Sequence, residues 1–492
     1  MLWYQINPDY FTQIAQKKNP QISLEQSIFK IITETLHYVK EVGFDGVRLM
    51  PFYIRGELGK KGFGSPYAVK EYRVNPKLGT EKDLLDLVKI AHDLGLKIIT
   101  EFIPNHLAQD SQYIIDNPNL VYRDEKGEIF HDQNWSDTVK LNHRSVDTKK
   151  FIKNTLVNIL EKYSFDGFRL DMAHYVYYDE KGNRVQDIFW KDIFEDTVLE
   201  EDETYIMAEI YDDRNKDING YKDFIEMLSQ RKYVYDKKMH DIVAHRLQEN
   251  QNWNISDSVY NELKNEYIAQ ESNAGVDFHE HHFLRITSNH DDSPAILNFG
   301  GVEKYLLAYS IFALLPGDNI LYAGDEYGIT VKPSVTGENH YDDRGNLTET
   351  DKIIFSDDNT QAKIFEYIVS FNNDVKPDIK SAFYNFTVLK TYNNSGIDHD
   401  VFAFSLYSEY EKTAYLIAAN FTNSEKWVKI VETYPDFKNN KIKTFENFIS
   451  FLQKDELTTI DIISGKDLGQ RKINEEFWIE IPSLGLTILK LE

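Results

Sequence analysis

The sequence predicts an α/β protein whose main domain is a parallel (β/α)8 barrel, followed by a C-terminal antiparallel β-sandwich. From Trp3 to about Asn373, short apolar runs are followed repeatedly by longer amphipathic segments, as in successive βαβ units. From about Phe383 the pattern changes to short β-rich runs separated by polar turns. The first region is longer than the roughly 250 residues of an ordinary barrel. We therefore expect insertions within it.

The first units have clear boundaries. Trp3–Ile6 is predicted as the first strand, and a capping-box pattern predicts that the next helix opens at Ser23. Gly46–Pro51 is predicted as the second strand. Thr80 is expected to cap the following helix, which ends at a glycine, Gly95.

The later units repeat this alternation. Helices are expected around Thr148–Tyr163 and Asp187–Leu199, each leading into a short apolar run. The remaining barrel strands are predicted at Leu96–Ile103, Gly167–Asp171, Tyr205–Glu209, Tyr233–Tyr235, Leu284–Ser288 and Asn319–Tyr322.

These elements divide the chain into three parts. We predict the barrel over residues 1–106 and 148–380, an inserted irregular subdomain over 107–147, and the β-sandwich over 381–492. The inserted segment follows the third strand and is rich in Asp, Asn and Tyr. A second insertion is expected near Ile329–Thr350, after the last barrel strand.

Composition excludes several classes of function. Lys and Arg number 55 against 80 Asp and Glu, giving a formal charge of −25, which argues against nucleic-acid or anionic-membrane partners. Without cysteine there are no disulfides, catalytic thiolates, zinc–thiolate sites or iron–sulfur clusters. The apolar run Ile311–Leu315 is too short for a membrane span, and Met1–Asn7 lacks the features of a signal peptide. We expect a cytoplasmic location.

Polar residues end several predicted strands, where the active sites of parallel barrels lie. Asp171, Glu209 and Asp291 each end a separate strand. A single acid at a strand end is more often a turn or helix cap, but burying many charges on one rim is costly unless they are paired. The combination therefore favours a site. The same rim carries His106, Arg169 and His290.

Two nearby carboxylates are the groups that glycoside hydrolysis requires. One, kept protonated by burial and by the second negative charge, gives a proton to the leaving oxygen. The other attacks the anomeric carbon or activates water. Sequence spacing leaves the distance between them open, and with it the choice between retention and inversion.

Four strand ends, in this order, resemble the four signature regions of glycoside hydrolase family 13, the α-amylase family. The likeness continues in the first strand, in Gly64–Tyr67 and in Tyr322–Glu326, so it covers the whole barrel. It implies a barrel of the TIM type and an irregular subdomain at the insertion. The four segments are Glu101–His106, Gly167–His174, Ile206–Glu209 and Ile286–Asp291.

The resemblance also implies residue roles and a retaining double displacement. Asp171 would be the nucleophile that forms a covalent glycosyl-enzyme, and Glu209 the general acid and then base. Asp291 would hold the distorted sugar and stabilise the transition state. The implied substrate-binding residues are Tyr67, stacking on the sugar, Arg169, pairing with the nucleophile, His106 and His290, binding hydroxyls, and His174, on the acceptor side.

Two departures from the family pattern bear on function. Glu101 stands where the first region usually begins with Asp, a mostly structural position. His174 and Tyr175 stand where many amylases have Lys and His, which leaves the acceptor and the bond type open. The leading hypothesis is a retaining hydrolase of α-glucans or malto-oligosaccharides. The alternatives are a transglycosidase (a glucanotransferase or isomerising enzyme) with the same intermediate and a non-catalytic sugar-binding or scaffold protein.

The chemistry itself requires no cofactor. The resemblance raises a structural calcium ion, with Asn105 as a ligand beside acids of the inserted segment, although solvated loop acids explain the same pattern. Trp135 is a candidate sugar platform or a loop anchor, and we expect Trp427 and Trp478 to serve the β-domain core as readily as a ligand. The candidate calcium acids are Asp110, Asp116, Asp124, Asp132 and Asp137.

Overall fold

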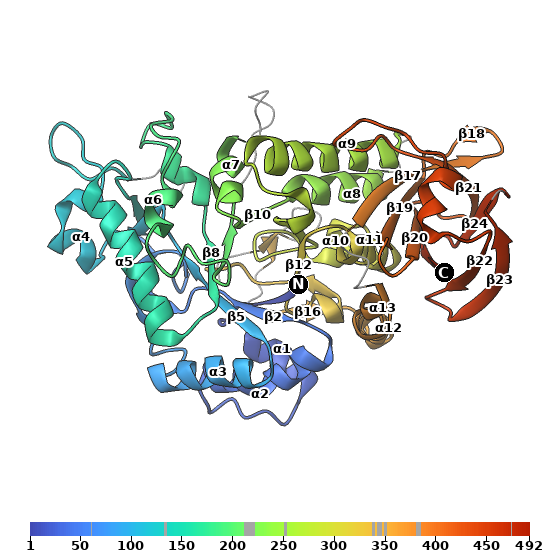
Figure 1. Cartoon of the computed structure of the whole chain (residues 1–492). Helices are drawn as coiled ribbons and strands as arrows, with labels where there is room; N and C mark the ends of the chain where they lie inside the picture. The colour runs from blue at the N-terminus through green and yellow to red at the C-terminus, as the bar shows by residue number, and fades with distance from the viewer. Residues whose placement is uncertain are drawn as a thin grey trace.

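The computed structural model contains a closed parallel barrel with helices around it (Figure 1). It describes residues 1–60, 62–131, 135–210, 222–249, 253–336, 340–341, 347–348, 352–379, 385–473 and 475–492. The strand order around the barrel is β1-β12-β11-β10-β9-β8-β5-β2, which confirms the predicted fold class. The strands are β1 (Leu2–Ile6), β2 (Gly46–Leu49), β5 (Lys97–Phe102), β8 (Gly167–Leu170), β9 (Tyr205–Ala208), β10 (Tyr233–Tyr235), β11 (Phe283–Ile286) and β12 (Asp318–Tyr322).

Side-chain alternation along the barrel strands separates two cores. In β8, Phe168 and Leu170 pack in the large core that includes the surrounding helices, so Gly167 and Arg169 face the other way, into the barrel. Gly167 faces a crowded position, because a Cβ there would lie 1.8 Å from the carbonyl oxygen of Tyr205. A smaller inner core fills the barrel with Trp3, Ile99, Met207, Tyr235, Leu284, Ile286 and Ile320.

The outer helices follow the sequence pattern with two corrections. Thr80 forms the predicted capping box with Asp83 at the start of α3 (Glu81–Asp93), and Gly95 follows the end of that helix with φ +68°. The prediction that a helix opens at Ser23 is wrong. The hydroxyl of Ser23 only accepts the amide of Glu25 in a short turn. The N-cap of α2 (Ile28–Glu41) is Ser27, whose hydroxyl accepts the backbone N–H of Lys30.

The second correction is the helix expected over Asp187–Leu199. Only α6 (Trp190–Phe194) forms. It ends there because the hydroxyl of Thr197 donates a hydrogen bond to the carbonyl of Phe194 and because Asp196 has a left-handed φ of +57°. A helix that the sequence did not predict, α1 (Phe11–Lys18), precedes α2. The other long helices are α5 (Val146–Tyr163), α7 (Lys222–Ser229), α8 (Lys237–Glu249), α9 (Ile255–Tyr267), α11 (Val302–Leu314) and α12 (Asp358–Ser370), with short α10 (Ala295–Asn298) and α13 (Lys376–Ile379).

Small β-pairs lie on the connections after the strands. In the segment between β5 and α5, strands β6 (His106–Ala108) and β7 (Thr138–Lys140) pair antiparallel beside α4 (Gln112–Asp116). Among the described residues, the expected second insertion carries three short strands, β13 (Ile329–Val331), β14 (His340–Tyr341) and β15 (Leu347–Thr348). Strand β14 pairs with β15, and β13 pairs with β16 (Ile354–Phe355). After β2, strand β3 (Tyr53–Arg55) pairs with β4 (Val69–Val74).

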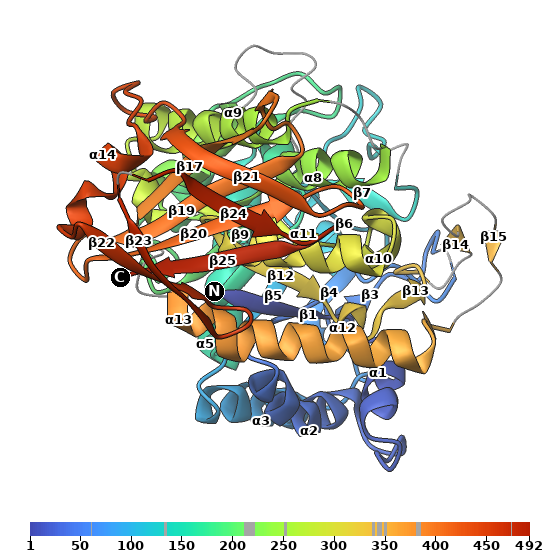
Figure 2. The same cartoon turned by 90° about the vertical axis from the view of Figure 1, so that its right-hand side faces the viewer.

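The C-terminal region is antiparallel, as predicted, and its strands join in one sheet that curls around its own core (Figure 2). The order is β23-β22-β25-β20-β19-β17-β21-β24. The sheet packs on α9, where the Ser256 hydroxyl donates to the carbonyl of Val401 at 2.9 Å. Its elements are β17 (Asn385–Asn393), β18 (Gly396–Ile397), β19 (Val401–Ser408), β20 (Thr413–Asn420), β21 (Lys426–Thr433), α14 (Phe445–Ile449), β22 (Glu456–Asp461), β23 (Lys466–Lys472), β24 (Phe477–Ile481) and β25 (Leu486–Leu491).

Among the described residues, no helix is both long and apolar enough to cross a membrane.

Candidate active site

Arg169, near the end of β8, is the centre of the predicted site. Its side chain is fully buried, and its guanidinium contacts carboxylates from three strand ends. Nη1 donates to Glu101 at 2.9 Å and to Asp171 at 2.7 Å. Nη2 lies 2.5 Å from Glu209 in an ion pair that lacks hydrogen-bond geometry. Because a buried cation is costly unless it is paired, this cluster ties the ends of β5, β8 and β9 together.

Glu101, at the end of β5, bridges two arginines. It accepts from Arg48 Nη2 at 2.7 Å, from Arg169 at 2.9 Å and from the Tyr67 hydroxyl at 2.9 Å. Burial raises the pKa of Glu101, but the two guanidinium groups outweigh it and hold the pKa below its usual value. Arg48 lies outside the predicted set of site residues. The signal for it is a charge inside the apolar run Gly46–Pro51.

Hydrogen bonds define the tautomer of His290. Its Nδ1 lies 2.9 Å from Gln5 Nε2, which can only donate, so Nδ1 is the acceptor. Its Nε2 lies 2.8 Å from the Tyr67 hydroxyl, and that hydroxyl already donates to Glu101. Nε2 therefore carries a hydrogen and is the donor of this contact. The same Nε2 lies 3.1 Å from Asp291, which joins the seventh strand end to the cluster.

Asp291 faces the opening of the site. Its side chain is 54% exposed, against 10% for Asp171 and 2% for Glu209. Desolvation raises the pKa of Asp291, but His290 first, and then the cations Arg169 and Lys332, outweigh it. The pKa is held well below its usual value, so this carboxylate is ionised at neutral pH.

Asp171, which follows the end of β8, has a raised pKa. Burial raises the pKa of Asp171 to about 8, against the effect of Arg169 and with further help from the charge of Glu209. The second oxygen of Glu209 accepts the backbone N–H of Met172 at 2.8 Å. Met172 has φ +44°, so the chain turns sharply right after Asp171. With its pKa raised to about 8, Asp171 keeps a proton around neutral pH.

The two remaining predicted substrate-binding residues, His106 and His174, lie beside the rings of Trp135 and Tyr175, which we call the aromatic wall. The ring of His106 is 5.6 Å from that of Trp135, which is 5.9 Å from Tyr175. His174 is 4.5 Å from Tyr175. Burial lowers the pKa of His106 to about 4 and also lowers that of His174, so both rings are neutral at pH 7. The structure thus places both histidines beside aromatic faces, and His174 also lies against the backbone of Glu209, one member of the carboxylate cluster.

The residues near Asn105 do not fit a calcium ion. The ammonium of Lys140 donates to Asn105 Oδ1 at 2.7 Å and to the carbonyl of Tyr175 at 3.3 Å, so a cation already takes the amide oxygen. The predicted acids are also engaged separately. Asp110 pairs with Lys70 at 2.8 Å, Asp116 accepts from Gln112, Asp124 closes its own turn with the amides of Lys126 and Glu128, Asp137 is buried, and Asp132 lies outside the described residues.

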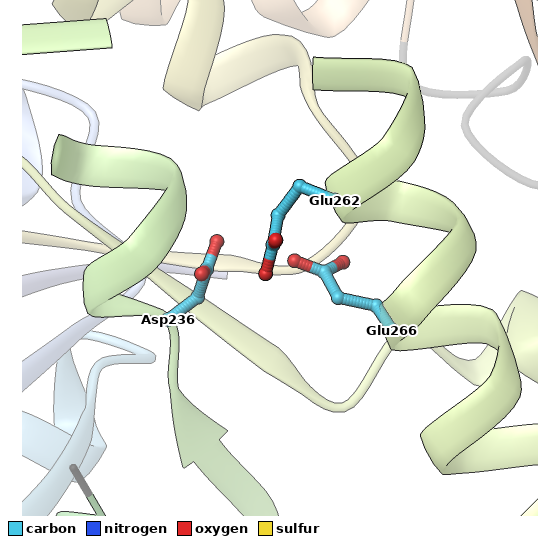
Figure 3. A group of neighbouring side chains, drawn as sticks. All are labelled: Asp236, Glu262 and Glu266. Atoms are coloured by element: carbon cyan, nitrogen blue, oxygen red, sulfur yellow. The ribbon is translucent and has the colours of Figure 1, made fainter. Parts of the chain in front are cut away.

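Among the described residues, the carboxylates that gather closely enough for a metal ion lie elsewhere. Figure 3 shows Asp236, Glu262 and Glu266 pointing toward one another. Arg285 already sits on this cluster, contacting Asp236 and forming two bonds to Glu266 at 2.5 and 2.8 Å. Burial raises the pKa of Glu266 to about 8. The arginine and a proton retained by Glu266 therefore offset two of the three negative charges.

A family model matches most of the chain. The alpha amylase catalytic domain matches residues 5–126 and 120–447. The sequence is 25% identical over 321 residues to alpha-amylase 3 of Dictyoglomus thermophilum, covering 61% of this chain and 59% of that one. It is 24% identical over 240 residues to an intracellular maltogenic amylase of Bacillus subtilis, covering 43% of this chain and 38% of that one. These matches thus span less than two thirds of each relative.

Solved structures show the same fold over the full chain. A maltogenic alpha-amylase from Thermotoga neapolitana superposes with a TM-score of 0.71 at 17% identity, covering 100% of this chain and 98% of that one. An alpha-amylase from Geobacillus thermoleovorans, crystallised with acarbose, gives 0.70 at 17% identity with the same coverage. The barrel and the C-terminal sheet are therefore shared features.

Proposed function

The chain belongs to the alpha-amylase family, and from this premise we propose that it is a retaining α-glycoside hydrolase acting on α-glucans or malto-oligosaccharides. The observation that carries the proposal is the buried guanidinium of Arg169 beside Glu101, Asp171 and Glu209. Within this cluster the pKa of Asp171 is raised to about 8, which supports a retained proton at a site where an acid–nucleophile pair requires one.

In the proposed mechanism Asp171 attacks the anomeric carbon and forms the covalent glycosyl-enzyme. Arg169 stabilises its ionised form through the 2.7 Å hydrogen bond. Glu209 donates the proton to the leaving oxygen and later takes one from water. In the structure its two oxygens are held by Arg169 at 2.5 Å and by the backbone N–H of Met172 at 2.8 Å.

The remaining residues of the site would bind the sugar. Asp291, ionised and facing the opening, would stabilise positive charge on the oxocarbenium-like transition state. We assign Tyr67 to stacking on the sugar ring and His106 and His290 to its hydroxyls. His174 would lie on the acceptor side.

The aromatic wall supports a second candidate, transglycosylation. Trp135 and Tyr175 offer flat faces beside His174, where an acceptor sugar could stack and compete with water for the glycosyl-enzyme. Chromatography of products separates the two functions. Oligomers longer than the substrate mean transfer, and only shorter products mean hydrolysis.

The proposal is tested with maltose, maltotriose, isomaltose, sucrose, trehalose and starch. We expect reducing-sugar release from α-glucans, and Asp171→Asn and Glu209→Gln are expected to abolish it while the fold is retained. The matched control is Asp86→Asn, which alters a carboxylate on the outer face of α3. Full activity in Asp171→Asn would refute the assigned nucleophile. A wild-type protein without release or transfer on every sugar would support a non-catalytic binder.

Two further properties belong to this proposal. We place the protein in the cytoplasm, as the name of the Bacillus subtilis relative suggests for that protein. We also propose that the ammonium of Lys140 holds the inserted segment to the barrel where a calcium ion would otherwise be sought, since it joins Asn105 to the carbonyl of Tyr175.

A further inference from the structure

Two tryptophans of the C-terminal sheet lie on one outward face. Trp427 on β21 pairs in register with Glu480, and Trp478 on β24 pairs with Lys429. The two indoles are therefore diagonal neighbours on adjacent antiparallel strands. Trp427 is 53% exposed, whereas Val428 beside it is buried in the sheet core. They are separated by 50 residues of chain, so their proximity could not be seen in the sequence.

These tryptophans line a cavity of about 330 Å³, which we call the tryptophan cavity. It lies where β21 and β24 approach β22, β23 and β25 across the curled sheet. Side-chain hydrogen bonds join β24 to β23 and to β25 at this place. Arg471 donates to the carbonyl of Trp478 at 2.8 Å, and Thr487 donates to that of Glu480 at 2.8 Å. The cavity is thus a built part of the sheet rather than a gap at a loop.

Both indole rings are held in place. The N–H of Trp427 donates to Glu425 at 3.0 Å, and that of Trp478 donates to Glu476 at 2.9 Å. Glu476 is held in turn by Lys429 at 2.5 Å. Each indole therefore has its polar atom satisfied, and its apolar ring surface is what it can offer to a ligand. Rings that are already ordered lose little conformational entropy on binding.

The rim of the cavity indicates an uncharged ligand rich in hydroxyls. Glu425, Asp461 and Glu480 stand with Lys466 and Arg471, so neither sign of charge dominates. A pyranose ring has an apolar face that fits an indole and hydroxyls that bind carboxylates and cations. The net charge of −25 also disfavours an anionic ligand.

We propose that the tryptophan cavity is a second binding site for α-glucan chains, separate from the catalytic barrel. The identity of the ligand rests on the proposed function, whereas the existence of the site rests on the two indoles and the cavity. Such a site would retain polymeric substrate at the C-terminal domain while the barrel cleaves it, and it would have little effect on short substrates.

The test compares the wild type with Trp427→Ala, Trp478→Ala and the double variant. Tyr410→Ala is the matched control, because Tyr410 is an aromatic residue 96% exposed elsewhere on the same domain. Retardation in gels containing glycogen measures polymer binding, and kcat/KM on maltotriose measures the barrel. We expect the double variant to bind glycogen at least about tenfold more weakly, with kcat/KM on maltotriose within about twofold of wild type.

The outcomes separate this inference from the proposed function. Unchanged glycogen binding in the double variant overturns the second site, even where the enzyme is active. Loss of glycogen binding supports the site even if no substrate is cleaved, in which case only the proposed function fails. Light scattering of the same variants adds a third outcome. Dissociation of a wild-type dimer, with glycogen binding unchanged, would make this face a contact between copies and overturn the inference.

Discussion

Replacing Glu101 by Gln removes the charge that two buried arginines share. Arg48, Arg169 and Glu101 all have fully buried side chains, and Glu101 accepts four hydrogen bonds from Arg48, Arg169 and Tyr67. Removing one partner of a buried ion pair costs about 3–5 kcal/mol. With an unfolding entropy of about 2.1 cal/mol/K per residue, a cooperative unit of this chain's length would lose roughly 3–5 °C in Tm.

The control is Glu101→Asp, which keeps the charge and differs by one methylene group. Thermal unfolding at pH 7, followed by circular dichroism, should place Glu101→Asp closer to wild type than Glu101→Gln. The pKa of Glu101 is lowered in the fold, so its stabilisation is present above the unfolded pKa, about 4.3, and is lost as pH falls through the lower folded value. The difference in Tm between wild type and Glu101→Gln should therefore become smaller at acid pH. A Tm of Glu101→Gln within 1 °C of wild type at pH 7 would refute the bridging role.

The other predictions concern the site and the inserted segment. The pKa of Asp171 is raised to about 8, so the folded state binds an extra proton between about pH 4 and 8, and stability falls as pH rises through that window. Asp171→Asn should accordingly gain in Tm relative to wild type toward pH 8, and a gain that is constant with pH would contradict the shift. Chelation with EDTA should change Tm by less than 1 °C. Lys140→Met should lower Tm by several degrees without rescue by calcium, whereas a loss of stability on chelation would contradict the role of Lys140. Trp135→Ala should lower the ratio of transfer to hydrolysis in product chromatography, and an unchanged ratio would remove Trp135 from the acceptor side.

The sequence predicted what depends on local pattern. The strand at Tyr233–Tyr235 and the capping box of Thr80 follow from a few adjacent residues, and both are confirmed. Ser23 shows the limit of such patterns, since Ser27 offers the same cap four residues later and the apolar stripe of α2 begins beside it.

Features that depend on register could not be read from the chain. Arg48 enters the site only because parallel pairing of β2 with β5 sets it beside Ile99. Glu101 is two residues further along β5, so it lies on the same face of the sheet as Ile99. The tryptophan cavity needs the antiparallel register of β21 and β24. The residue roles of Asp171, Glu209 and Asp291 stay predictions, drawn from the family resemblance and supported by their place in one network.

Charge balance does not by itself distinguish the two buried acidic clusters, because each retains a proton. At the rim, Arg48 and Arg169 supply two positive charges against three negative charges from Glu101, Asp171 and Glu209, and a proton on Asp171 offsets the excess. The second cluster has a similar excess of acid, with Arg285 as its guanidinium, and it too retains a proton.

Access separates the two clusters. The side chains of Asp236 and Glu266 are each 1% exposed, whereas Asp171 is 10% exposed and Asp291, beside it in the network, is 54% exposed. A proton held where no substrate can reach it contributes only to the stability of the fold and its pH dependence. The same proton at the open rim can be delivered to a glycosidic oxygen. The position at the strand ends, more than the number of acids, therefore makes the first cluster the candidate for chemistry.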